Sequence, residues 1–584
     1  MKKYLFLTNI LGFLLITSFG VGCKQEFLDF KPAGVISDED LNTVENAEKM
    51  IIAAYASLGN DGLLAHQYGD MWVYGSVRSD DAYKGGGSIG DQFDSHMVEV
   101  FTLNTPANGN SNLMWTYLYA GISRVNDAMR RVQGLSDEEY QTKAGVSRAQ
   151  RLAELRFIRG HYEFILKVLY KFPVYIDETI AKDDIINVSN REKSDQEGWA
   201  YIADEFRAGV ESLPAVQPEE GRPTKNAARA YLAKVLLYKA YIQNDQHQVT
   251  SINAAELEEV VSLISTIEST GEYSLYDDFA KNFLWEYESG AESVWAIMRS
   301  IDDGSPEGRG NFSTGLTSSL GPGYGCCSFN QGSQNLANAF KTDANGLPLF
   351  NSFMQGENIE TAQDIQSNNM DPRIAHTLGI IGMPFKYDPN RIYDSTYARV
   401  PGVYGYVLGM KDQELPSSPA FRQYQAFFSI SRNTDQIRFG DLLLMKAEAL
   451  IELGRMGEAL PIINAIRERA GSTASTSRLV YANGNPTGQW KVGTYSTLGT
   501  QEEARTILRW ERRLELAFES KRFFDLVRWG VAAETLNAYF NTEKQYRDYL
   551  NEARFTSGRD EYLAIPQTQI TISRGLYQQN PGYN

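Results

Sequence analysis

Residues 507–530 read Ile-Leu-Arg-Trp-Glu-Arg-Arg-Leu-Glu-Leu-Ala-Phe-Glu-Ser-Lys-Arg-Phe-Phe-Asp-Leu-Val-Arg-Trp-Gly. Apolar side chains recur here at steps of three and four residues, at Ile507, Trp510, Leu514, Ala517 and Phe518. This period places them on one face of an amphipathic helix, which has to pack against other helices. The stretch therefore predicts a mainly α-helical protein.

A row of carboxylates borders this apolar stripe, at Glu511, Glu515 and Glu519. Like charges at four-residue steps repel one another on an isolated helix, so cations must compensate them. We expect these cations to be Arg512, Arg522, Arg528 or side chains of a neighbouring helix. The sequence favours an ion-pair network at a helix junction over an acid/base or metal site, because no histidine of the metal-binding type lies nearby.

The N-terminus predicts a lipoprotein signal peptide over residues 1–22. Lys2 and Lys3 precede an apolar run that is too short to span a bilayer comfortably, and Gly20 and Gly22 lead to Cys23. A cysteine in this position resembles the acylated first residue of a bacterial lipoprotein, although Gly20 stands where leucine is usual. Acyl chains on Cys23 are expected to hold the protein on a membrane, whereas simple secretion is the alternative.

Helical periodicity continues in two blocks that flank an irregular region. The first block predicts helices over residues 38–58, 112–129, 152–169, 194–213, 224–242 and 254–270. Residues 271–434 show almost no helical pattern apart from 333–340, and their many aromatics argue for ordered structure. The last block, 435–540, contains a helix, a turn at Gly454-Arg455 and a second helix, which resemble a tetratricopeptide-type pair. We expect tetratricopeptide-like helix pairs to form a scaffold and the loop-rich region to hold the ligand site.

Two aromatic and polar clusters in predicted loops are the candidate ligand sites. Residues 59–106 are interpreted as long loops over the helical body. Such side chains can stack on a sugar ring and hydrogen-bond its hydroxyls, or clamp a peptide, and the alternative for each aromatic is packing beneath a loop. The first cluster comprises Trp72, Tyr74, Arg78, Asp80, Asp81 and Tyr83, and the second comprises Phe312, Tyr324, Cys326, Phe329 and Asn330.

Besides Cys23, only the adjacent Cys326 and Cys327 are present. Neighbouring Cα atoms lie about 3.8 Å apart, below the usual disulfide range of roughly 4.4–6.8 Å. We expect two free thiols, with a bonded pair or a thiol pair at a ligand site as alternatives.

Several function classes are disfavoured by composition. The formal charge of −17 argues against nucleic acid as a partner. The five histidines lack ligand spacing and no phosphate-binding loop is present, so we expect no cofactor, metal or catalytic residue. A hydrolase built on a carboxylate pair stays open, since the 73 acidic residues offer many pairs.

The stretch 511–530 resembles the C-terminal signature of the SusD/RagB family of nutrient-binding lipoproteins. Further segments similar to the family are 112–126, 153–173, 565–567 and 579–583, so the resemblance covers the mature chain. It implies an N-terminal helical region with ligand loops over 23–270 and a C-terminal region over 271–584. It also implies a lipid anchor at Cys23 and exposure at the outer-membrane surface.

The same resemblance implies a function without catalysis. The protein is expected to bind extracellular oligosaccharide and to pass it to a SusC-like TonB-dependent transporter. Family ligand sites vary among members, so the candidate residues rest on loop position and chemistry alone. The alternatives are oligopeptide binding of the RagB type and a surface glycoside hydrolase.

Overall fold

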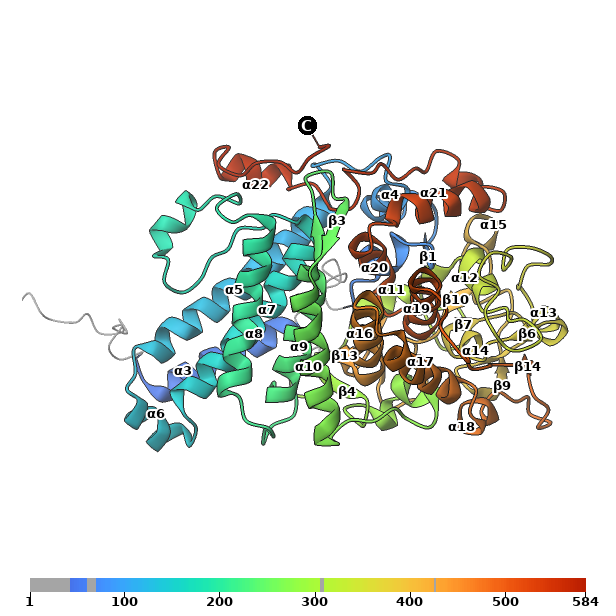
Figure 1. Cartoon of the computed structure of the whole chain (residues 1–584), viewed down its shortest axis with the longest axis horizontal. Helices are drawn as coiled ribbons and strands as arrows, with labels where there is room; N and C mark the ends of the chain where they lie inside the picture. Colours follow the sequence, from blue (N-terminus) through green and yellow to red (C-terminus); the bar gives the residue numbers. More distant parts are fainter. Residues whose placement is uncertain (1–41, 60–69, 305–308, 425–426, 584) are drawn as a thin grey trace, which may run out of the picture.

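The computed structural model describes residues 42–59, 70–304, 309–424 and 427–583 (Figure 1). As predicted, long helices dominate both ends of this part of the chain. They are α3 (Val44–Leu58), α5 (Gly109–Gln133), α7 (Arg148–Tyr170), α8 (Asp195–Ser212), α9 (Lys225–Ala240), α10 (Ala254–Thr270), α16 (Phe439–Glu452), α17 (Met456–Ala470) and α19 (Gln501–Leu516).

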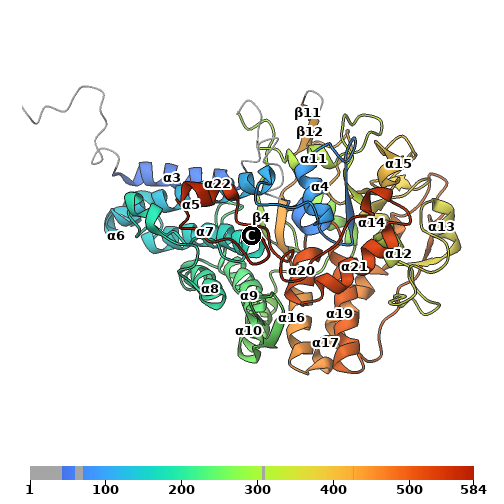
Figure 2. The ribbon, with the colours of Figure 1, turned by 90° about the horizontal axis from the view of Figure 1, so that it is seen from above.

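These helices form one continuous array of neighbouring pairs. In order, α3 packs on α5, α5 on α7, α7 on α8, α8 on α9 and α9 on α10. The array then crosses the irregular region, because α10 packs on α16, and α16 packs on both α17 and α19. Figure 2 shows α8, α9, α10, α16, α17 and α19 side by side along one edge of the molecule. The tetratricopeptide-like scaffold is therefore confirmed, and one helical layer joins the two halves of the chain.

Local signals in the sequence explain where these helices begin and end. Ser194 and Glu197 form a reciprocal capping box at the start of α8, which satisfies backbone N–H groups that lack helical partners. Gly271 ends α10 in the left-handed conformation, with φ of 68°. The close approach of α8 and α9 depends on Gly209, since a Cβ there would lie 2.8 Å from the Cβ of Ala228.

The middle of the chain is irregular but ordered, as predicted. It forms short elements, including β4 (Ser293–Ile297), α11 (Ser313–Thr317), α12 (Gln334–Ala339) and the hairpin β11 (Phe421–Tyr424) and β12 (Phe427–Ile430). A four-stranded sheet in the order β1-β5-β10-β7 joins distant segments, namely Ala82–Gly85, Phe329–Gly332, Leu408–Gly409 and Leu378–Gly379. In Figure 2 the hairpin and α11 lie on the side opposite the helical edge.

The interpretation of residues 59–106 as long surface loops is wrong for the described part. Residues 73–77 form a buried π-helical turn, β1 pairs with β5, and Phe93–Val100 form the helix α4. Gly75 in the π-helical turn lies against Ser520, because a Cβ on Gly75 would come 2.2 Å from the Ser520 carbonyl oxygen. The mixed polar sequence hides this packing, since no period marks a turn held by partners far away in the chain.

The helix through Ile507 is shorter than expected, and the start of the first predicted helix is not described. The helix through Ile507 ends at Leu516, and Phe518 and Ser520 adopt positive φ angles of 63° and 57° before α20 (Arg522–Arg528) begins. Ala517 and Phe518 are buried in this break. The first predicted helix is described from Val44, so its expected acidic start lies outside the described residues.

Candidate functional site

The carboxylate row of α19 meets cations that the sequence did not single out. Glu511 accepts hydrogen bonds from Arg373 at 2.6 Å and from Arg467 at 2.8 Å. Glu515 accepts from Arg373, Arg438 and Arg469 at 3.2, 2.7 and 2.5 Å. The expected ion-pair network is confirmed, but most of its cations come from outside the row's own stretch.

The arginines that we expected to pair with this row of carboxylates pair with other acidic residues instead. Arg512 bonds Asp525 and Asp441, Arg528 bonds Asp525 and Glu448, and Arg522 bonds Asp80. All these carboxylates are buried and paired, which leaves none of them free for acid/base chemistry. The signature stretch is therefore the ionic centre of the fold.

The first predicted ligand cluster is part of this ionic centre. Asp80 pairs with Arg522 at 2.8 Å and with Arg513 at 3.2 Å, while Asp81 pairs with Arg513 at 2.9 Å. Burial by itself would raise the pKa of Asp80, but Arg513 and Arg522 outweigh it and lower the pKa to about 2. The expectation of exposed ligand contacts is wrong for both residues, because their charges are needed to satisfy buried arginines.

The other members of the first cluster are buried as well. Arg78 donates to the Asp560 carbonyl at 2.7 Å and lies 4.1 Å from the ring centre of Phe523. Tyr83 donates to Glu543, and Tyr74 is fully buried. Trp72 is 2% exposed and donates to Ser313 at 3.1 Å, but its side chain also lines a pocket.

The second predicted cluster divides between core and surface. Tyr324 donates to the Glu414 carbonyl at 2.6 Å and packs on Phe428, and Phe329 is 1% exposed in β5. Asn330 is buried and lines the same pocket as Trp72. Phe312 and Cys326 are half-buried. Tyr324 and Phe329 thus follow the alternative of packing beneath a loop, and Asn330 is buried beside the pocket.

Cys326 and Cys327 form a disulfide with Cα atoms 3.1 Å apart, so the expectation of free thiols is wrong. Cys327 is buried and Cys326 reaches the surface in the loop that leads into β5. The bonded-pair alternative is thus the one found.

Three loops meet around this disulfide, at residues 86–92, 318–328 and 393–400. Together with the residues that flank them, they form a surface that we call the loop face. Gly86 donates to the Ser328 carbonyl at 2.9 Å, and Leu320 donates to the Tyr397 carbonyl at 2.9 Å, which ties the loops together. Arg399 and Asp91 bridge two of them at 3.1 Å, with both side chains partly exposed. Other side chains of the loop face that reach the solvent include Ser88, Ile89, Phe93, Leu320, Cys326 and Arg391.

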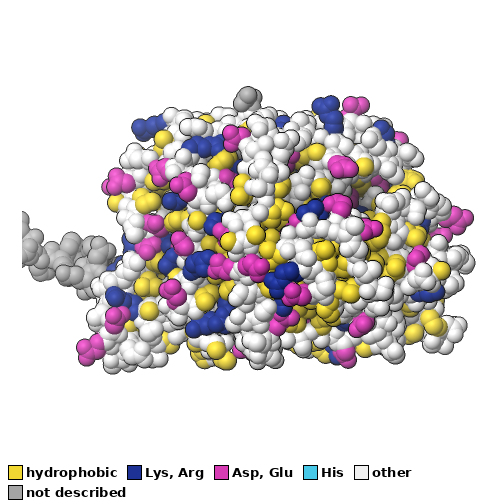
Figure 3. All heavy atoms as spheres, in the orientation of Figure 1, with side chains coloured by type: hydrophobic (Ala, Val, Ile, Leu, Met, Phe, Trp, Pro, Cys, Tyr) yellow, Lys and Arg dark blue, Asp and Glu magenta, His cyan; other side chains and the backbone are white. Residues whose placement is uncertain are grey.

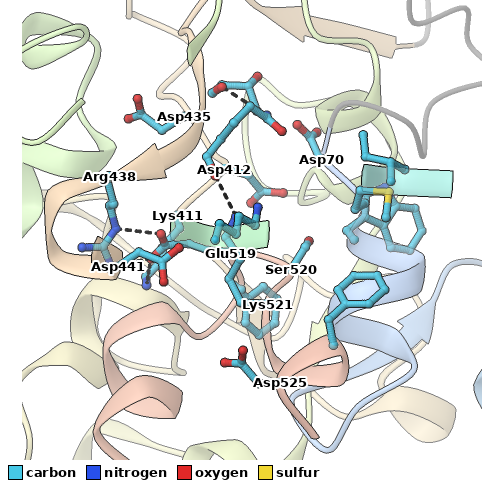
Figure 4. A pocket seen from close by; sticks show the side chains of 18 of the residues that line it. Asp70, Lys411, Asp412, Asp435, Arg438, Asp441, Glu519, Ser520, Lys521 and Asp525 are labelled. Carbon is cyan, nitrogen blue, oxygen red and sulfur yellow. Dashed lines mark hydrogen bonds and ion pairs between the residues drawn. The ribbon is translucent and has the colours of Figure 1, made fainter. Parts of the chain in front are cut away.

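A deep pocket lies between the two halves of the chain (Figure 4). Its empty volume is about 1360 Å³, open solvent included. Helices α7 and α9 supply a mainly apolar wall that includes Phe164 and also carries His161 and Lys234. Residues within 411–412, 432–441 and 518–528 supply a charged wall. Pockets between structural units, with apolar lining and a few convergent polar groups, are frequent ligand sites.

Sequence reasoning missed the pocket although one signal was present. Lys234 stands on the apolar stripe of α9, where Ala227, Tyr231 and Tyr238 precede and follow it at helical spacing. A lysine on a buried helical face is unusual unless its charge has a partner. The charged wall gave no such signal, because its residues are scattered over the irregular region and the signature.

Two family models match this chain. The model described as "SusD family" matches residues 291–583, and the model described as "Starch-binding associating with outer membrane" matches residues 26–237. The first match covers half of the chain. The chain belongs to the SusD family. The SusD family is associated with the outer membrane.

Similar proteins agree with membership of the SusD family. "SusD-like protein P2" of Formosa agariphila is 24% identical over 597 residues, which cover 100% of each chain. A solved "Laminarin binding SusD-like protein" has a TM-score of 0.66 at 20% identity, over 92% of this chain and 99% of the other. "Surface glycan-binding protein A from Bacteroides fluxus" has a TM-score of 0.65 at 20% identity, over the same shares. These structures share the fold of this SusD family member.

The described residues of this SusD family member contain no helix long and apolar enough to span a bilayer. Within the same residues, no three His, Cys, Asp or Glu side chains converge closely enough to ligate a metal ion.

Proposed function

We propose that this SusD family member is a lipid-anchored, non-catalytic binding protein that captures extracellular oligosaccharide and passes it to a SusC-like TonB-dependent transporter. Membership of the family supports this function, as do solved relatives named for laminarin and surface glycan binding. The observation that carries the proposal is the loop face, where apolar and charged side chains are exposed together on the irregular part of the chain.

The chemistry of the loop face suits a carbohydrate. Phe93 is 48% exposed and Ile89 is 44% exposed, so each can cover the apolar face of a sugar ring. Asp91 and Arg399 lie beside them and offer acceptors and donors for hydroxyl groups. Because this pair is partly solvated, its atoms can exchange water for ligand without leaving a buried charge unpaired.

The ion pairing of the acidic side chains favours binding over hydrolysis. A glycosidase needs two carboxyl groups that flank the scissile bond, one as an acid and one as a base or nucleophile. On the loop face, the carboxylate of Asp91 pairs with Arg399 at 3.1 Å. The acids of the signature are buried and bonded to arginines.

Calorimetric titration of the purified protein against plant, microbial and host oligosaccharides tests the proposal, with oligopeptide pools alongside. We expect one glycan class to bind, and Phe93→Ala and Arg399→Ala each to raise its Kd about tenfold, which corresponds to about 1.4 kcal/mol. Tyr117→Ala is the matched control, since Tyr117 is 39% exposed on α5.

Three results contradict the proposal in different ways. Binding of peptides alone favours the RagB-type alternative, and turnover of a bound glycan favours the hydrolase. If glycan binding is unchanged by both loop-face substitutions, the glycan site lies elsewhere on the protein.

A further inference from the structure

The pocket between the two halves of the chain is lined by cations and by carboxylates that have no oppositely charged partner among the described residues. Lys234 makes no hydrogen bond or ion pair with the described residues, and its Nζ lies 4.5 Å from the ring centre of Phe164 and 5.5 Å from that of Tyr231. Lys521, which also lines the pocket, donates only to the Gln436 carbonyl, at 3.0 Å. Both ammonium groups therefore lack an anion within the described chain.

His161 adds a third unsatisfied group beside the two lysines. It is 2% exposed, its Nδ1 lies 2.9 Å from the Tyr231 hydroxyl, and its Nε2 has no partner. Burial, with Lys234 and Lys521 close by, lowers the pKa of His161 to about 3, so the ring is neutral. Burial and Lys521 also lower the pKa of Lys234 well below its ordinary value. An anionic ligand beside these groups would offset the effect of burial, because an opposite charge favours their protonated forms and raises both pKa values.

The acidic side chains nearest to Lys234 are already paired with arginines. Asp441 and Asp525 lie in the same part of the pocket, but both are bonded to Arg512, at 3.1 and 2.9 Å. Asp525 also accepts a hydrogen bond from Arg528, at 2.7 Å.

Three carboxylates of the pocket have no cationic partner among the described residues, and Figure 4 labels them as Asp70, Asp412 and Asp435. Asp70 accepts from Asn311 at 2.9 Å, Asp412 accepts from Thr317 and Gln413 at 2.5 and 3.1 Å, and Asp435 accepts from Ser293. Arg432 is near them, but it bonds Glu414 and the Lys411 carbonyl. Burial raises the pKa of Asp435 to about 6 and also raises that of Asp412, as expected for acids without a matching cation.

We infer that this pocket is a second saccharide site, separate from the loop face, which binds a uronic acid residue. The sugar carboxylate pairs with Lys234 and Lys521, and the sugar hydroxyls donate to Asp70, Asp412 and Asp435. Aromatic side chains such as Trp72 and Phe164 line the same pocket. The inference rests on the proposed function only in that the ligand is a saccharide.

The ligand class follows from the pattern of charge. A neutral sugar would use the acceptors and leave the two ammonium groups unpaired. A simple carboxylate would pair with the lysines and leave the acids without donors. A uronic acid supplies both a carboxylate and several hydroxyl donors, and charge-assisted hydrogen bonds of this kind are stronger than neutral ones.

The test is titration of the purified protein with D-galacturonate and D-galactose, which differ in the carboxylate. We expect galacturonate to bind at least tenfold more tightly, and Lys234→Met to bring its Kd to that of galactose. Lys239→Met is the control on the same helix, because Lys239 pairs with Glu256 at 2.6 Å. Asp412→Asn is expected to weaken both sugars.

Folding of the key variant is checked separately. Lys234→Met removes an unpaired buried charge, so its Tm should equal or exceed that of the parent. Equal affinity for the two sugars, or galacturonate binding that survives Lys234→Met in a folded protein, overturns the inference. The inference is also overturned if an amino acid such as glycine competes with galacturonate and binds more tightly than it. Phe93→Ala should leave galacturonate binding unchanged, which separates this test from that of the loop face.

Discussion

Single buried ion pairs at the residue scale decide what the acidic side chains of this protein can do. Glu515 contacts three arginines and is fully buried, whereas Glu502, on the same helix, is 73% exposed beside Arg505. A buried charge without its partner costs far more than a solvated one. The same residue type is therefore essential at one position and dispensable at the other.

Glu515→Gln is expected to lower the free energy of unfolding by about 3–5 kcal/mol, because Arg373, Arg438 and Arg469 lose a buried anion. Glu502→Gln, the matched control, should change it by less than about 0.5 kcal/mol. Urea denaturation of both variants measures the difference. Equal stabilities would contradict the role assigned to the network.

The pH dependence of stability has a definite sign in this network. Burial would raise the pKa of Glu519, but Arg438 and Lys411 lower it to about 2. A carboxyl group with a depressed pKa contributes stability that is complete above its unfolded pKa, about 4.3. This contribution is lost as the pH falls from there towards 2.

At the scale of elements, contacts between distant segments determine which stretches are packed. The π-helical turn Val73–Val77 contacts α20, and β1 pairs with β5, although more than 240 residues separate the two strands. Helices such as α8 and α9, by contrast, pack on their neighbours in sequence. Periodicity in the sequence reveals helices that pack on their neighbours in sequence, but it does not reveal turns and strands held by distant segments.

Gly75→Ala tests whether the turn at residues 73–77 is packed as described. The added methyl group would lie 2.2 Å from the Ser520 carbonyl oxygen, so we expect a loss of about 1–3 kcal/mol in the free energy of unfolding. Gly90→Ala is the control, because its nearest neighbour, Ser88 Oγ, would be 3.6 Å away. Two variants of equal stability, compared by thermal unfolding, would mean that the turn is loose.

At the scale of the whole molecule, the helical array holds the two halves together and encloses the pocket between them. The face seen in Figure 3 carries Lys and Arg interspersed with Asp and Glu, and hydrophobic atoms lie between them. Charges mixed in this way give no broad basic surface for nucleic acid on that face. Under the proposed function, attachment to the membrane depends on the proposed lipid anchor at Cys23.

Cys23→Ala is expected to move the protein from the outer-membrane fraction to the soluble fraction, because the variant cannot carry the acyl chains. Fractionation followed by immunoblotting measures this shift. Contact with the transporter could retain the variant, so the comparison is made in cells that lack the transporter. Retention in the outer membrane of those cells would contradict the proposed anchor.

The helical scaffold could be predicted closely from the sequence, and the candidate sites could not. The helix predicted at 254–270 is observed as Ala254–Thr270, because its apolar period and its terminal Gly271 are local signals. Trp72 and Asn330 do line a pocket, yet Asp80, Asp81 and Tyr83 are buried against partners more than 400 residues away. The exposed loop face was found only in part, through Cys326.

The sequence by itself determined the helices and the membership of the family, because both depend on short patterns of residues along the chain. Only the tertiary structure decided which acids are neutralised, which aromatics are exposed and that Lys234 has no anionic partner among the described residues. The physical reason is that burial and charge pairing depend on distances in space. Those distances are set by packing between segments that the chain order keeps far apart.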